Sequence, residues 1–180
     1  DSARTRGCGR RAGDRSREHQ LGFLMDQATF RAMGTTAHVV VNGGSRDLLD
    51  TARSRIEELE SRWSRFREDS EISRLNRHGF VRVSPDTEDL VVRSISGWER
   101  SGGRFDPTVY RSMLRLGYSC TFDRIDTCSS AQAAEPAPGC ADIEVVAGTV
   151  RLPDGVGFDP GGIGKGLAAD IVASELVTRG

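Results

Sequence analysis

The apolar positions of the first 66 residues change from a strand-like to a helical pattern. Residues 29–33 and 36–41 flank Gly34, and the second run is rich in β-branched side chains, which predicts two short strands. Residues 42–45, Asn-Gly-Gly-Ser, predict a turn. Apolar side chains then recur at steps of three and four, which predicts a helix with one buried face. The members of this stripe are Leu49, Ala52, Ile56, Leu59, Trp63 and Phe66.

Capping and turn signals divide the following stretch. Asp69 or Ser70 is suited to cap a short helix. Residues 81–83 predict a strand. Ser84-Pro85 then predicts the start of a second long helix, which Gly102-Gly103 ends.

The last third of the chain continues the mixture of strands and helices. Residues 105–114 predict a short helix, residues 119–140 a loop, and residues 143–146 and 149–152 a β-hairpin. A final helix carries an apolar stripe made of Ile163, Leu167, Ile171 and Leu176. Because strands and helices do not alternate regularly, we predict an α+β fold with a mixed or antiparallel sheet flanked by helices.

Composition and charge narrow the class of protein. The chain has 180 residues, a formal net charge of −1, 37% hydrophobic residues and 28% charged residues. This length fits one domain or part of one. The near-neutral charge argues against a general nucleic-acid binder. No apolar run approaches the ~18 residues of a transmembrane helix.

The two ends of the sequence are unusual. Residues 1–24 are rich in arginine and nearly free of apolar residues before Leu21, which predicts a disordered or non-native extension. We place the folded part at residues 25–180, with Met25 as a candidate start. The chain ends at Gly180 within a helical pattern, so we interpret it as a fragment. The absence of a secretory or lipid-attachment signal favours a cytoplasmic location.

The four cysteines and the single lysine are the next candidates for chemistry. The four cysteines, Cys8, Cys120, Cys128 and Cys140, lack Cys-x-x-Cys spacing, so we expect free thiols and no zinc site. Lys165 is the one lysine among 25 basic residues.

That lysine lies in a glycine-rich segment, residues 155–166, between a predicted strand and the last predicted helix. Glycines let backbone N–H groups approach an anion, and a helix N-terminus adds about half a positive charge. The segment matches neither a Walker A loop nor a dinucleotide-binding fingerprint. Phosphate binding and simple close packing therefore both remain open. Asp106 and Asp159 each lie between Phe and Pro, and each is either a helix cap or a pocket carboxylate.

Four segments in order resemble the FAD:protein FMN transferase (ApbE) family across roughly residues 28–178. They are Ala32-Met33-Gly34-Thr35, the run from Arg65 to Asn76 (Arg-Phe-Arg-Glu-Asp-Ser-Glu-Ile-Ser-Arg-Leu-Asn), Gly103-Arg104-Phe105-Asp106-Pro107-Thr108-Val109, and Phe158-Asp159-Pro160-Gly161-Gly162-Ile163-Gly164-Lys165-Gly166.

The resemblance implies an enzyme that transfers FMN from FAD to a threonine hydroxyl of an acceptor protein, with Mg²⁺ and with release of AMP. It implies that Gly162 is a metal ligand through its backbone carbonyl. No catalytic residue is assigned. The residues expected to contact the flavin nucleotide are Met33, Phe66, Arg104, Phe105, Asp106, Asp159 and Lys165.

Two alternatives remain, a non-catalytic FAD-binding module and an FAD pyrophosphate hydrolase. The family places an Asp and a Thr metal ligand, and a histidine-bearing segment, later in its sequence. These have no counterpart before Gly180, so we expect this chain to bind Mg²⁺ poorly and to be impaired in transfer.

Overall fold

A three-stranded antiparallel sheet opens the fold. The computed structural model describes residues 17–20, 23–118, 133 and 135–179. β1 (Arg17–Gln20), β2 (Phe23–Ala32) and β3 (Thr35–Asn42) lie side by side in that order. The hairpin from β2 to β3 turns at Met33 and Gly34, whose φ angles of 50° and 72° are both left-handed, as a type I′ turn requires. The two strands predicted around Gly34 are confirmed, and each is longer than predicted.

Four residues of the segment predicted to be a disordered or non-native extension, residues 1–24, form strand β1. Residues 1–16 and 21–22 lie outside the described residues. The backbone of Arg17–Gln20 pairs antiparallel with β2, from Arg17 opposite Asp26 to Gln20 opposite Phe23. Backbone hydrogen bonding to an existing strand gives this segment its structure, and that driving force leaves no apolar pattern in the sequence.

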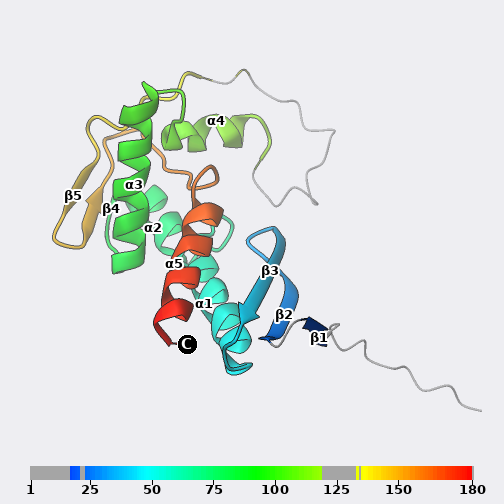
Figure 1. Cartoon of the computed structure of the whole chain (residues 1–180). Coiled ribbons are helices and arrows are strands. Elements are labelled where there is room, and N and C mark those ends of the chain that lie inside the picture. Colours follow the sequence, from blue (N-terminus) through cyan, green and yellow to red (C-terminus); the bar gives the residue numbers. More distant parts are fainter. Residues whose placement is uncertain (1–16, 21–22, 119–132, 134, 180) are drawn as a thin grey trace, which may run out of the picture.

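Helix α1 (Asp47–Trp63) lies at the centre of the fold. It packs on β2 and β3 and runs alongside α5 (Gly164–Arg179) (Figure 1). Its predicted stripe is buried from Leu49 to Trp63. The stripe does not reach Phe66, because the helix ends at Ser64, whose backbone is extended, and the Phe66 side chain is 43% exposed.

A second three-stranded antiparallel sheet lies beyond α1. It consists of β4 (Phe80–Arg82), β6 (Thr149–Arg151) and β5 (Glu144–Val146), with β6 in the middle. The predicted hairpin from β5 to β6 is confirmed. α2 (Glu71–His78) packs against β4, and α3 (Pro85–Ser101) packs against β5 and β6.

The helix caps follow the local sequence signals. Ser70 caps α2 by accepting a hydrogen bond from the Ser73 N–H, so Ser70 and not Asp69 fills this role. Ser84 caps α3 in the same way, and α3 ends at Gly102 in a left-handed conformation.

A short 3₁₀ turn, η1 (Pro107–Val109), leads into α4 (Tyr110–Arg115). Most of the loop predicted at residues 119–140 lies outside the described residues. The α+β class with antiparallel strands flanked by helices is confirmed, with two small sheets in place of one. Within the described ranges, no helix has the length and apolar character needed to span a membrane.

Candidate functional site

The two Phe-Asp-Pro segments of the sequence meet in the structure. The Asp159 N–H donates to the Pro107 carbonyl at 2.7 Å. A Cβ at Gly162 would lie only 2.8 Å from Cε2 of Phe105, so the glycine lets the loop approach this ring. Together the segments line a pocket of about 560 Å³. Five of the eight predicted site residues lie there: Arg104, Phe105, Asp106, Asp159 and Gly162.

Asp106 caps η1 and also lines the pocket. Its Oδ1 accepts hydrogen bonds from the Thr108 N–H at 2.8 Å and from the Thr108 hydroxyl at 2.5 Å, which caps η1. The Thr108 hydroxyl oxygen in turn accepts from the Gly139 N–H at 3.0 Å. These hydrogen bonds fix the orientation of the Asp106 carboxylate at the edge of the pocket.

Asp159 is buried and held at both oxygens. Its Oδ1 accepts from the Gly161 N–H at 2.8 Å, and its Oδ2 lies 3.3 Å from Nε of Arg65. Asp159 is not the cap of α5, because that helix begins at Gly164. The side chain instead braces the turn that carries Gly161 and Gly162 along the pocket.

Asn76 fastens the same loop to α2. Its side-chain amide donates to the Phe158 carbonyl at 2.8 Å, and its amide oxygen accepts from the Phe158 N–H at 2.7 Å. Phe158 is completely buried. Asn76 ends the second of the four family-like segments, and no role was predicted for it. No local signal identifies a partner 82 residues away.

Phe66 lies in a second pocket of about 240 Å³, next to Arg65, Asn76 and Tyr110. The Arg65 guanidinium carbon is 4.5 Å from the centroid of the Phe66 ring. Arg65 therefore contacts both Phe66 and Asp159, one from each pocket. Arg65 lies in the second of the four family-like segments, but no role was predicted for it, because its contact with Asp159 joins positions far apart in the sequence.

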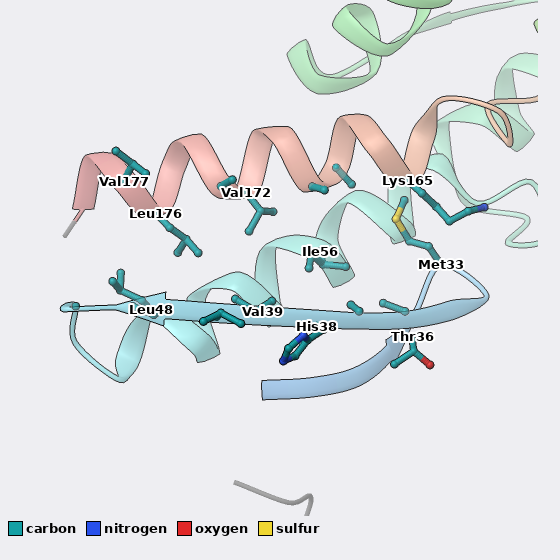
Figure 2. Close-up of a pocket in the computed structure, with 18 of the residues that line it drawn as sticks. Met33, Thr36, His38, Val39, Leu48, Ile56, Lys165, Val172, Leu176 and Val177 are labelled. Atoms are coloured by element: carbon teal, nitrogen blue, oxygen red, sulfur yellow. The ribbon is translucent and has the colours of Figure 1, made fainter. Parts of the chain in front are cut away.

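The remaining two predicted residues, Met33 and Lys165, lie at one end of a groove between β3 and α5 (Figure 2). The groove has a volume of about 780 Å³, and most of its lining side chains are apolar. Met33 holds a left-handed φ of 50°, which is strained for a long side chain. Lys165 is exposed in the first turn of α5. The predicted nucleotide contacts are thus distributed over three separate hollows and not gathered in one.

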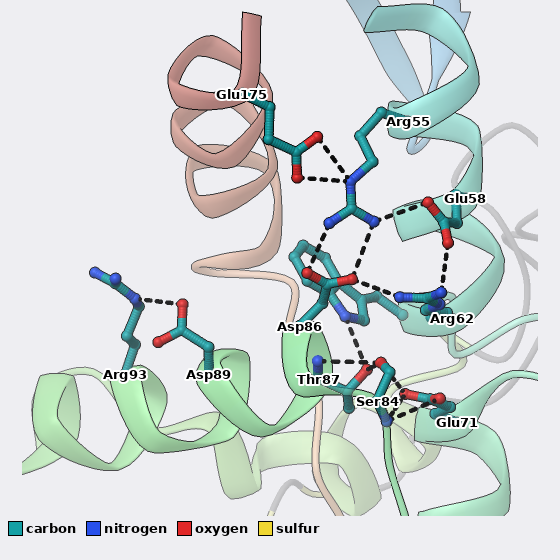
Figure 3. Close-up of polar contacts among 11 residues, drawn as sticks. Arg55, Glu58, Arg62, Glu71, Ser84, Asp86, Thr87, Asp89, Arg93 and Glu175 are labelled. Atoms are coloured by element: carbon teal, nitrogen blue, oxygen red, sulfur yellow. Dashed lines mark hydrogen bonds and ion pairs between the residues drawn. The ribbon is translucent and has the colours of Figure 1, made fainter. Parts of the chain in front are cut away.

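An ionic cluster fixes the position of α5, and with it that of Lys165. Arg55 of α1 makes two hydrogen bonds to the Asp86 carboxylate of α3, at 2.7 and 3.0 Å, and donates from Nε to Glu175 of α5 at 3.0 Å (Figure 3). The hydrogen bond with Asp86 is the main cause that raises the pKa of Arg55, which stays protonated. Three helices are thereby joined through one guanidinium group.

The described residues contain no group of three His, Cys, Asp or Glu side chains arranged to hold a metal ion. Asp106 and Asp159 already accept hydrogen bonds from the protein. A Mg²⁺ ion takes few protein ligands and keeps water or phosphate oxygens, so these residues supply at most part of its shell. Burial raises the pKa of Cys140 to about 12, which keeps that thiol protonated.

The family model described as ApbE family matches residues 33–180. Among curated proteins, no sequence matches the chain. Several solved structures have a similar fold, among them three ApbE proteins. These three are the ApbE protein of Thermotoga maritima (20% identity, TM-score 0.64), the flavin transferase ApbE of Vibrio cholerae (22%, 0.69) and the flavinyl transferase ApbE of Pseudomonas stutzeri (18%, 0.73).

These structures are considerably longer than the chain. The alignments cover 93%, 87% and 89% of this chain, but only 53%, 54% and 57% of the Thermotoga, Vibrio and Pseudomonas proteins respectively. The chain thus spans about half the length of each, and the likeness to these structures concerns the fold.

Proposed function

The chain belongs to the ApbE family, and on that premise we propose that it forms the nucleotide-binding part of a flavin transferase. The proposed donor is FAD, and the acceptor is a protein that carries a target threonine. The threonine oxygen attacks the phosphorus of the FMN half of FAD. The bond from that phosphorus to the bridging oxygen breaks, AMP leaves with the bridging oxygen, and the threonine hydroxyl proton passes to solvent or a base.

The observation that carries this proposal is the pocket where the two Phe-Asp-Pro turns meet. We assign the aromatic face of Phe105 to packing against the nucleotide and Arg104 to its phosphates, since a guanidinium pairs well with phosphate oxygens. Asp106 and Asp159 accept hydrogen bonds from ring N–H or ribose hydroxyl groups. The absence of a side chain at Gly162 lets the loop lie against the Phe105 ring.

We assign the other three predicted residues to the edges of the same nucleotide. Phe66 packs against a ring of the ligand from the second pocket, and Met33 contacts it from the strained hairpin turn. Lys165 adds a positive charge near the N-terminus of α5, where backbone N–H groups also favour an anion.

Magnesium is part of the proposal only for the complete site. The Gly162 carbonyl is our candidate for one ligand, and phosphate oxygens and groups outside this chain would supply the others. Bound there, Mg²⁺ would neutralise charge on the phosphates during cleavage. We expect the 180-residue chain alone to bind Mg²⁺ weakly and to transfer FMN slowly or not at all.

A second candidate is a non-catalytic FAD-binding module. A chain of this kind could hold FAD without cleaving it. Hydrolysis of the FAD pyrophosphate to free FMN and AMP is the remaining alternative.

Flavin fluorescence and product analysis separate these functions. The 180-residue chain is titrated into FAD, and then incubated with FAD, Mg²⁺ and a threonine-containing acceptor protein. FAD binding supports the proposed site, and AMP release with flavin left on the acceptor identifies a transferase. AMP with free FMN identifies a hydrolase, and binding without products identifies the module. A well-folded chain that fails to bind FAD contradicts the proposal.

A further inference from the structure

Arg65 is a nearly buried arginine whose contacts converge from three parts of the chain. Its side chain is 12% exposed. Nη1 donates to the Tyr118 carbonyl at 2.7 Å, Nε lies 3.3 Å from Oδ2 of Asp159, and the guanidinium carbon lies 4.5 Å from the Phe66 ring centroid. A buried guanidinium requires such partners, because an unpaired charge in this environment is strongly unfavourable.

The partners of Arg65 belong to two different pockets. Phe66 and Arg65 line the smaller pocket, and Asp159 lines the larger one between the Phe-Asp-Pro turns. The Arg65–Asp159 contact therefore lies between the two. A change in the position of this guanidinium would displace the Phe66 ring in one pocket and the Asp159 carboxylate in the other.

The contact also completes the orientation of Asp159. Because Oδ1 is held by the Gly161 N–H, Arg65 is the partner that fixes Oδ2. The carboxylate side chain is only 8% exposed, so water is a poor substitute for the arginine. The positive charge of Arg65 further offsets the negative charge that Asp159 would present to the phosphates of a nucleotide.

We propose that Arg65 is a positioning residue that holds Asp159 and Phe66 in one arrangement, so that both pockets receive a single flavin nucleotide. This inference rests on the proposed function, since it takes FAD as the ligand. Arg65 itself acts through its two neighbours. The guanidinium plane and its hydrogen-bonding geometry both contribute, so lysine replaces arginine only in part.

A double-mutant cycle on FAD affinity tests this role. Arg65→Gln, Asp159→Asn and the double variant are compared with the unchanged 180-residue chain by quenching of FAD fluorescence. We expect Arg65→Gln to weaken FAD binding about tenfold or more, as removal of a group that orients a binding residue does. The loss of affinity in the double variant should be smaller than the sum of the two single losses, because part of the effect of Arg65 passes through Asp159.

Two further variants separate positioning from general stability. Arg93→Gln removes an exposed arginine of α3 that pairs with Asp89, and it should leave FAD affinity unchanged. Arg65→Lys keeps the charge and should recover part of the affinity lost in Arg65→Gln. Urea unfolding of each variant shows whether it is folded under the binding conditions. If Arg65→Gln does not fold, the cycle is run from Arg65→Lys, with the same expected non-additivity.

The outcomes distinguish this inference from the proposed function. FAD binding by the unchanged chain with additive effects of Arg65 and Asp159 overturns the positioning role alone. The same holds if folded Arg65→Gln binds FAD as the unchanged chain does. Failure of the unchanged, folded chain to bind FAD overturns the proposed function and this inference with it.

Discussion

Asn76 allows a quantitative test of how the loop that carries Asp159 is held. The substitution Asn76→Ala removes both the donor to the Phe158 carbonyl and the acceptor from the Phe158 N–H. Phe158 is fully buried, so its backbone groups have few other partners within reach. The substitution therefore deletes two hydrogen bonds. The Phe158 carbonyl and N–H are left without these partners and can hydrogen-bond only to water that enters the vacated space.

The expected loss of stability follows from these contacts. An intramolecular hydrogen bond contributes about 1 kcal/mol net, and a buried backbone group left unpaired costs about 1–3 kcal/mol. Because Asn76 is only partly buried, water can reach part of the vacated space, and we expect the free energy of unfolding to fall by about 2–4 kcal/mol. Such a loss is a large part of the ~5–15 kcal/mol of a typical domain.

Urea unfolding followed by tryptophan fluorescence provides the assay, since Trp63 is buried and Trp98 is partly buried. The midpoint should decrease while the slope with urea stays constant. Asn42→Ala is the matched control, because it deletes the same atoms at an exposed position. A loss for Asn76→Ala within ~0.5 kcal/mol of this control, the range of surface substitutions, would refute the reasoning. The loop would then be held by other contacts, such as the Asp159–Pro107 hydrogen bond.

Three further substitutions or conditions test other parts of the molecule. Gly162→Ala places a Cβ 2.8 Å from Phe105, so we expect a loss of about 1–3 kcal/mol and weaker FAD binding; thermal unfolding and FAD titration at wild-type levels would contradict this. Cys140 has a pKa raised from 9.0 to about 12, so unfolding releases a proton above pH 9 and stability should fall by up to ~1.4 kcal/mol per pH unit from there to pH 12. Cys140→Ser should reduce that decline, and an equal decline in both proteins argues against the buried thiol as its cause. Arg55→Met leaves Asp86 without its main partner and should cost about 1–3 kcal/mol in urea unfolding, whereas Arg93→Met should cost little.

Most elements could be predicted because their signals are local. Serine before a helix, glycine after it and the period of apolar residues act within a few residues of the structure that they determine. Ser70, Ser84 and Gly102 accordingly have the positions expected of caps. The apolar period continues through Phe66 although the helix does not, because period alone does not indicate where the backbone leaves the helix.

The site was predictable only in part, and for a different reason. The resemblance to a family indicated residues 104–106, 159 and 162, and the structure brings them to one pocket. Their functional roles remain predictions. The supporting residues, Arg65 and Asn76, act on partners far along the chain, and neither their type nor their spacing reveals those partners. The pairing of β1 with β2 was likewise hidden, since it depends on backbone groups that every residue has.

The two hydrogen bonds between Asn76 and Phe158 have a consequence for the order of folding. They join positions 82 residues apart, whereas the β2–β3 hairpin closes through residues that are close in sequence. Closing the longer loop requires more chain entropy to be given up before any contact compensates it. We therefore expect the hairpin and α1 to form early and the pocket to be complete only after the last loop has docked. A nucleotide bound as we propose would bind only the folded chain, and mass action would shift the folding equilibrium toward the native state.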